Sequence, residues 1–288
     1  MYRRSMLFPA AIAAAALGPG IVTGRETAGF FSQTGESAWL GVACAGTVFA
    51  LLTAGLIYMK TCTGAQSLSQ MTKRLPVRAG GIALRWFHGM LMAFEALLML
   101  ASAWEIGALT LPFRGGGAAG AGSALLIALG MTALPVEARM RIFAGNLALI
   151  LMFEAALAAF GRLPLAAGQY VEAELKLFGI NAAAALLGGI HASLCVCIAA
   201  NVVLRFAPVN ARPLRTGLCG GAFYAACLTV GNLAIRRQPG FVAALRLPLT
   251  ALAAGWGSAG FYLVTLLSFF ASVIVLHAAL LTFCDVKL

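Results

Sequence analysis

Eight stretches of this chain are apolar over about the length that a helix needs to cross a lipid bilayer, roughly 20 residues. They cover residues 6–31, 38–59, 82–109, 121–136, 142–160, 181–207, 214–235 and 255–283. Only 10% of the 288 residues are charged, whereas about 25% are charged in an ordinary soluble domain. Folding alone could not keep so much apolar surface away from water. The sequence therefore predicts an all-α polytopic membrane protein with one transmembrane domain, residues 1–288, and excludes a soluble enzyme, a secreted disulfide scaffold and a disordered chain.

The basic residues lie mainly between the apolar stretches. The net charge is +11, from 20 Lys and Arg against 9 Asp and Glu. This excess would indicate nucleic-acid binding in a soluble protein, but it is typical of cytoplasmic loops in a membrane protein. With the N-terminus inside, roughly twice as many basic residues fall inside as outside. We therefore expect cytoplasmic N- and C-termini and no nucleic-acid partner.

One further apolar stretch, 241–254, is not counted as a span because it contains Arg246 and Pro248. We expect an interfacial or re-entrant segment there. If it crossed the membrane, there would be nine spans and the C-terminus would change sides.

The first apolar stretch contains a helix-breaking sequence at its centre, Leu-Gly-Pro-Gly at positions 17–20. Pro19 removes a backbone donor, and the glycines nearby disfavour helix. A continuous helix over 6–31 would be about 39 Å long, more than the roughly 30 Å hydrocarbon core. The pattern predicts an unwound centre. The alternatives are a simple kink at Pro19, or close helix packing through Gly20 and Gly24.

A helix start follows the break. Thr23 and Glu26 have the spacing of a capping box, in which Thr23 accepts from the Glu26 amide and Glu26 reaches back to the Thr23 amide. Unpaired backbone groups in mid-membrane are tolerated only against protein or a wet cavity, and broken helices of this kind form solute sites in transporters. Glu26 has an alternative role as a cap alone. Arg25 and Glu26 both need partners, since unpaired charge in a membrane is costly.

The segment 20–31, Gly-Ile-Val-Thr-Gly-Arg-Glu-Thr-Ala-Gly-Phe-Phe, with Thr34-Gly35 and Gly41 after it, resembles the opening of the YkvI-type family of bacterial membrane proteins. That family is related to the amino acid–polyamine–organocation transporters. The stretch 189–208 resembles the family's sixth helix, and 247–249 the segment before its eighth.

The resemblance implies a LeuT-like bundle of two inverted five-helix repeats, each with a broken first helix, in the bacterial cytoplasmic membrane. Residues 1–160 would form the first repeat. Residues 181–288 would form a second repeat that lacks its last two helices, since the chain holds eight spans where the family has about ten.

The sixth span runs opposite to the first and has its own weak point at Gly188-Gly189-Ile190-His191. Two interrupted spans in corresponding halves point to the binding site, although the glycine pair has helix packing as an alternative. Free amides at the helix start would favour an anionic group of the solute. We expect the solute to be bound by Gly18, Gly20, Thr23, Gly24, Gly189, His191 and Ser193.

Carboxylates within spans are candidate ion or proton carriers. Glu95 and Glu105 fall in the third span and Glu154 in the fifth; a structural ion pair with Arg25, or a protonated carboxyl bonded to a neighbour, is the alternative. The family's eighth helix has paired threonines where this chain has Ala271-Ser272, so sodium coupling would depend on Ser272. The expected carriers are Glu26, Glu95, Glu154 and Ser272.

No metalloprotease, serine-hydrolase or P-loop motif occurs, the seven cysteines include no CxxC, and Asp285 is the single aspartate. We expect no enzyme activity, cofactor or metal site. Two hypotheses of function remain. The first is a secondary-transporter-like protein that binds a small polar solute, an amino acid or organic cation, with protons or sodium as coupling ion. The second is a non-transporting sensor or receptor subunit of the same fold, which works with a partner chain or as an oligomer.

Overall fold

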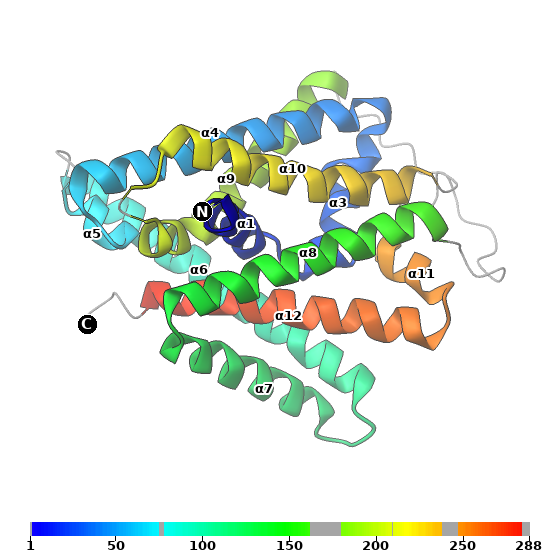
Figure 1. Ribbon diagram of the computed structural model, residues 1–288. Coiled ribbons are helices and arrows are strands. Elements are labelled where there is room, and N and C mark those ends of the chain that lie inside the picture. Colours follow the sequence, from blue (N-terminus) through cyan, green and yellow to red (C-terminus); the bar gives the residue numbers. More distant parts are fainter. Residues whose placement is uncertain (1, 75–77, 162–179, 209, 238–246, 284–288) are drawn as a thin grey trace.

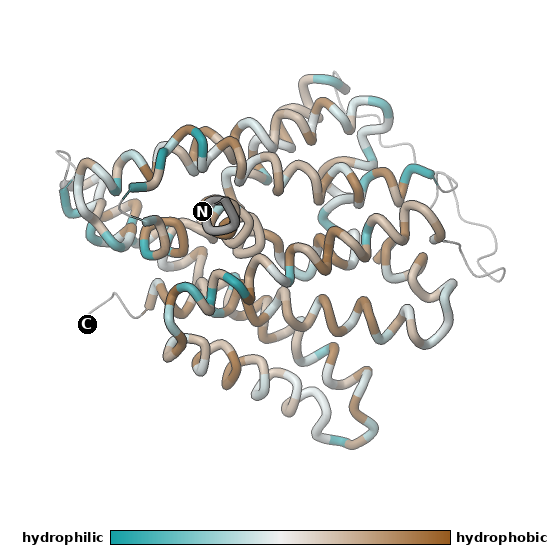
Figure 2. Tube along the Cα trace, viewed as in Figure 1, coloured by the Kyte–Doolittle hydropathy of each residue, from teal (hydrophilic) through white to brown (hydrophobic). Residues whose placement is uncertain are grey.

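The computed structural model describes residues 2–74, 78–161, 180–208, 210–237 and 247–283, and over these residues the chain is helical with no strand. Seven helical segments are long and apolar enough to cross a membrane, and Figure 2 shows mostly apolar residues along the bundle, with hydrophilic ones mainly toward its ends. The protein is thus a polytopic membrane protein. Its long helices are α4 (Ala38–Thr63), α6 (Arg78–Thr110), α7 (Gly116–Gly130), α8 (Val136–Phe160), α9 (Ile180–Phe206), α10 (Pro213–Arg236) and α12 (Ser258–Phe283).

These helices correspond to the second to eighth predicted spans, with ends shifted by a few residues. The starts of two helices shift most: α8 begins at Val136 rather than 142, and α7 begins at Gly116 rather than 121 and continues into the 3-10 turn η2 (Met131–Ala133). The glycines before residue 121 belong to the helix because they let α7 approach α6 closely. A Cβ on Gly107 of α6 would lie 2.7 Å from the Cα of Gly120, a separation that side chains do not tolerate.

The first predicted span is broken, as the sequence indicated. It consists of α1 (Tyr2–Ala16), the one-turn helix α2 (Pro19–Val22) and the short helix α3 (Arg25–Phe30), followed by the 3-10 segment η1 (Ser32–Ser37). Gly18 is extended, and Gly24 adopts a left-handed conformation with φ 79°. Residues 11–17 of this segment are buried, because α1 lies in the middle of the bundle and contacts α8, α9, α10 and α12 (Figure 1).

The predicted second break is wrong. Helix α9 runs without interruption through Gly188, Gly189 and His191. No proline accompanies Gly188 and Gly189, so every backbone amide there can keep its helical hydrogen bond. Gly188 instead serves close packing, since a Cβ there would overlap the backbone of Gly41 in α4. The packing alternative therefore holds for Gly188, and one of the two broken helices expected for a LeuT-like bundle is continuous.

The remaining helices surround the broken segment. Helix α4 packs along α9 and α10, and α6 packs along α7 and α12 (Figure 1). Two short helices complete the described part, α5 (Leu68–Thr72) and α11 (Pro248–Ala254). Of the stretch 241–254, residues 241–246 lie outside the described residues. The rest forms α11, whose seven residues are too few to cross a bilayer.

Candidate functional site

The Thr23 side chain satisfies part of the backbone at the break, but it does not form the predicted capping box. The Thr23 hydroxyl donates to the carbonyl oxygens of Pro19, at 3.0 Å, and Gly20, at 3.3 Å. The residue that precedes α3 is Gly24, and no side chain caps that helix. The prediction failed because a threonine at the end of a helical turn has the preceding carbonyls within reach of its hydroxyl. This leaves the Glu26 side chain free for another partner.

Helix α11 covers the other side of the break. The Leu249 amide donates to the Thr23 carbonyl oxygen at 3.0 Å. Gly24 makes this approach possible, since a Cβ there would lie 2.6 Å from the Leu249 Cγ and 3.0 Å from the Pro248 Cγ. The sequence did not predict this contact, although Arg246 and Pro248 set the segment 241–254 apart from the spans. The carbonyl exposed by the break is thus satisfied by protein.

Glu26 on α3 points toward His191 on α9. The distance between Glu26 Oε2 and His191 Nε2 is 3.2 Å, and the Tyr224 hydroxyl of α10 lies 2.5 Å from His191 Nδ1. The His191 side chain is 4% exposed and that of Glu26 is 34% exposed. Cys195 lies near the same imidazole, with its Sγ 3.9 Å from Nδ1. A chain of polar groups therefore leads from the partly open carboxyl at the break to a buried tyrosine.

Aromatic rings hold this chain of polar groups in place. The rings of Phe30 and Phe31 pack on His191, with centroids 4.7 Å and 5.4 Å away. The Tyr224 ring stacks on Phe49 at 4.3 Å. The surroundings of the imidazole are thus largely apolar, a setting in which charge and hydrogen bonds interact strongly.

The glycines of the break make room for the Glu26 carboxyl. A Cβ on Gly20 would overlap the Glu26 side chain, and one on Gly18 would lie 3.9 Å from Glu26 Oε1. Of the predicted solute-site residues, the structure therefore brings Gly18, Gly20 and His191 together around Glu26. Thr23 and Gly24 lie beside them in the backbone of the break.

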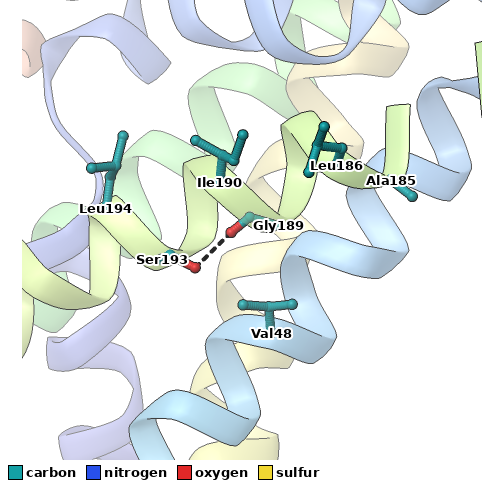
Figure 3. A pocket seen from close by; sticks show the side chains of 7 residues that line it. All are labelled: Val48, Ala185, Leu186, Gly189, Ile190, Ser193 and Leu194. Atoms are coloured by element: carbon teal, nitrogen blue, oxygen red, sulfur yellow. Dashed lines mark hydrogen bonds between the residues drawn. The ribbon is translucent and has the colours of Figure 1, made fainter. Parts of the chain in front are cut away.

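Gly189 and Ser193 do not belong to this group. The Ser193 hydroxyl donates to the Gly189 carbonyl at 2.8 Å, and both residues line an open, largely apolar groove that also contains Val48 of α4 (Figure 3). His191 is two residues from each, and two residues correspond to about 200° around a helix. The prediction of these two residues as solute ligands assumed an unwound backbone, and in the continuous helix their side chains point away from His191.

The other predicted ion carriers have different surroundings. Glu95 on α6 is partly buried and lies within electrostatic range of Glu26, while Glu105 is exposed. The Ser272 hydroxyl is occupied inside the bundle, where it donates to the Ser268 carbonyl at 2.9 Å. Arg25 is exposed, and no ion pair joins it to any of the described glutamates.

Glu154 on α8 is fully buried, and it forms a second cluster away from His191. Its carboxyl lies beside Gly231 of α10, and so does the Thr27 hydroxyl of α3. Neither of its carboxyl oxygens has a hydrogen-bond partner among the described residues. The alternative role of Glu154, a structural ion pair with Arg25, is thus not formed.

No protein-family model matches the chain, and no curated protein matches it.

Proposed function

We propose that this protein is a secondary-transporter-like membrane protein of the YkvI type, with a LeuT-related bundle, in the bacterial cytoplasmic membrane and with both termini inside. It binds a small polar solute at the break between α1 and α3. The observation that carries the proposal is the Glu26 carboxyl, which lies over an interrupted helix and is held by a buried histidine. An ionisable side chain kept within membrane-spanning helices marks a functional site by default, and interrupted helices are where transporters bind their solutes.

The charge at the break indicates the class of solute. Glu26 is partly exposed there, and Glu95 adds a second carboxyl within electrostatic range. The expected anion-binding helix start is not supported, because α3 is a short helix whose first turn holds Glu26 itself. A positively charged nitrogen fits the Glu26 carboxyl, the added negative charge of Glu95 and the partly exposed ring of Phe30. The solute is therefore an amino acid bound through its ammonium group, or an organic cation.

The coupling ion that fits this site is a proton. His191 contacts Glu26 through one ring nitrogen and Tyr224 through the other. An imidazole placed between two such groups can accept a proton on one side and release it on the other. Loss of a solute from Glu26 would then be accompanied by protonation of the Glu26–His191 pair.

Uptake into proteoliposomes tests the proposal. Purified wild type, Glu26→Gln and the control Glu105→Gln are reconstituted with a pH-sensitive dye inside and given radiolabelled alanine, lysine or choline with an inward proton gradient. We expect uptake of at least one probe by wild type and by the control, and a loss of at least tenfold in Glu26→Gln. Glu105 is a suitable control because it is an exposed carboxylate on the same helix as Glu95.

Two outcomes would contradict the proposal. Equal flux in wild type and Glu26→Gln would remove Glu26 from the site. Saturable, Glu26-dependent binding of a probe without any flux would support a non-transporting sensor or receptor subunit instead.

A further inference from the structure

Glu154 and its neighbours form a second polar cluster, where α3, α8 and α10 meet. The exposed fraction of Glu154 is 0%, and so is that of Thr27. Both carboxyl oxygens of Glu154 and the Thr27 hydroxyl lack a hydrogen-bond partner among the described residues. Buried polar groups are nearly always paired, and each unpaired one costs about 1–3 kcal/mol. Three such atoms from two helices therefore need a common explanation.

These atoms converge on one point beside Gly231. A Cβ placed on Gly231 would lie 3.3 Å from Glu154 Oε1 and 3.4 Å from Thr27 Oγ1. The carboxyl and the hydroxyl thus approach α10 at the position where it has no side chain. The next residue, Asn232, is also fully buried, and its Nδ2 has no partner.

Ser32 connects Asn232 to the same part of the chain. The Ser32 hydroxyl donates to Asn232 Oδ1 at 2.8 Å and lies 3.4 Å from the Thr27 carbonyl oxygen. If the Asn232 amide turns end for end, Nδ2 donates to the Ser32 hydroxyl and Oδ1 becomes a free acceptor. The Glu154 carboxyl and the Thr27 hydroxyl then offer three oxygen atoms beside Gly231. The Asn232 amide, on the next residue of α10, would offer a fourth.

Among the described residues, no basic side chain is paired with the Glu154 carboxylate. At the end of α10, Arg236 pairs with Glu36 at 2.5 Å and Arg237 donates to the Ala158 carbonyl at 2.8 Å, while Arg236 Nη1 has no partner among the described residues. Arg25 on α3 is exposed and makes no ion pair with a described glutamate. Cys227 on α10 is the other titratable group close enough to interact. An ionised carboxylate without a partner is very costly in such a place.

We propose that Glu154, Thr27 and Asn232 bind one monovalent metal cation of the sodium class. Carboxylate, hydroxyl and amide oxygens are hard ligands, which suit alkali and alkaline-earth ions. A single carboxylate selects the monovalent ion, because a divalent one would leave a net positive charge buried within the membrane-spanning bundle. Glu154 is one of the ion carriers that the sequence predicted, whereas Ser272, the residue expected to bind sodium on the eighth span, is not part of this site.

The cation site adjoins the proposed solute site through α3. Glu26 and Thr27 are consecutive residues, and one faces His191 while the other faces Glu154. A cation held between Thr27 and Glu154 would fix α3 against α8 and α10 and so hold Glu26 over the break. The cation binding itself does not require that the protein transports anything.

Binding of radioactive sodium to the purified full-length protein in detergent tests the proposal. Wild type, Glu154→Gln, Thr27→Val and the controls Glu105→Gln and Thr53→Val are incubated with ²²Na⁺ in choline chloride buffer at fixed pH. We expect about one saturable site per chain in wild type and in both controls. Its affinity should fall at least tenfold in Glu154→Gln and several-fold in Thr27→Val. Thr53 matches Thr27 because it too is a fully buried threonine with an unpartnered hydroxyl.

Thermal unfolding is measured beside binding, so that a variant with impaired folding does not obscure the result. Sodium should raise the unfolding midpoint of wild type and Thr53→Val relative to choline, and should not raise that of Glu154→Gln or Thr27→Val to the same extent.

The proposal is overturned if wild type binds no sodium saturably, or if Glu154→Gln binds it equally. It is also overturned if the midpoint depends on pH but not on sodium, since Glu154 would then hold only a proton. Glu26-dependent uptake in sodium-free buffer would leave the proposed function standing in all of these cases.

Discussion

The Nε2 atom of His191 lies 3.2 Å from the Oε2 atom of Glu26, although the two residues are 165 positions apart in the chain. The contact joins α3, which follows the break in the first span, to the continuous helix α9. The contact holds the Glu26 carboxyl in one position, which the break in the helix would not do by itself. Changes that alter this contact without removing either residue are therefore the most informative tests of the site.

Tyr224→Phe removes one hydroxyl from behind His191. Because the Tyr224 hydroxyl lies 2.5 Å from Nδ1 and is buried, its loss leaves that nitrogen without its close oxygen partner. We expect the free energy of unfolding to fall by about 1–2 kcal/mol. Denaturation in detergent micelles measures this, with the exposed Tyr262→Phe on α12 as the control, which should change by less than about 0.5 kcal/mol. Equal stability of the two variants would show that the hydroxyl contributes nothing to holding the imidazole.

Gly20→Ala places a methyl group where the Glu26 side chain lies. The carboxyl must then move away from His191, and we expect binding of the cationic probe to weaken at least tenfold while the protein remains folded. Gly29→Ala is the matched control, since Gly29 lies on α3, the helix that carries Glu26, and nothing lies within 4 Å of a Cβ placed there. Equilibrium binding of radiolabelled lysine or choline to both variants provides the measurement. Undiminished binding by Gly20→Ala would mean that the position of Glu26 over the break is not needed for the solute.

The sequence was sufficient for the spans and for the first break, because both depend on local properties. Apolar length predicts a crossing whatever its neighbours are, and Pro19 between two glycines disrupts a helix in any surroundings. It was not sufficient for the second break. Glycines at 188 and 189 are compatible with an unwound backbone and with close packing, and the choice is made by Gly41 on another helix.

The site was predicted only in part for the same reason. His191 was singled out as a polar residue at an expected break, so it was found even though the break does not exist. Gly189 and Ser193 were chosen by that reasoning too, but in a continuous helix they lie on the face opposite to His191. Tyr224, Phe49 and Leu249 carry no local signal of function, because their roles arise only when α10, α4 and α11 pack around the break.

The continuous form of α9 makes its own prediction about Gly188. A Cβ at Gly188 would overlap the Gly41 backbone, whereas one at Gly189 has only an ordinary contact at 4.0 Å with Val48. We therefore expect Gly188→Ala to lower the free energy of unfolding by about 1–3 kcal/mol through overpacking, and Gly189→Ala to leave it nearly unchanged or slightly raised. Thermal unfolding of the two neighbouring variants provides the comparison. If Gly189→Ala were the more harmful substitution, an unwound backbone at this position would have to be reconsidered.

Gly24 tests whether α11 is part of the break. An alanine at Gly24 is strained by the left-handed φ of 79° and would also press on Leu249 and Pro248. Gly64, which ends α4 with φ 67°, has the same backbone conformation, but nothing lies within 4 Å of its Cβ position. The left-handed conformation alone costs about 1–2 kcal/mol for alanine, so Gly64→Ala measures that part.

Gly24→Ala should lower the free energy of unfolding by at least about 1 kcal/mol more, because the backbone of α11 must also shift. The loss of the Leu249–Thr23 hydrogen bond should then appear as faster amide hydrogen exchange at Leu249 in Gly24→Ala and not in Gly64→Ala. Equal destabilisation with unchanged exchange would mean that α11 does not press on Gly24 and that the break is held without it.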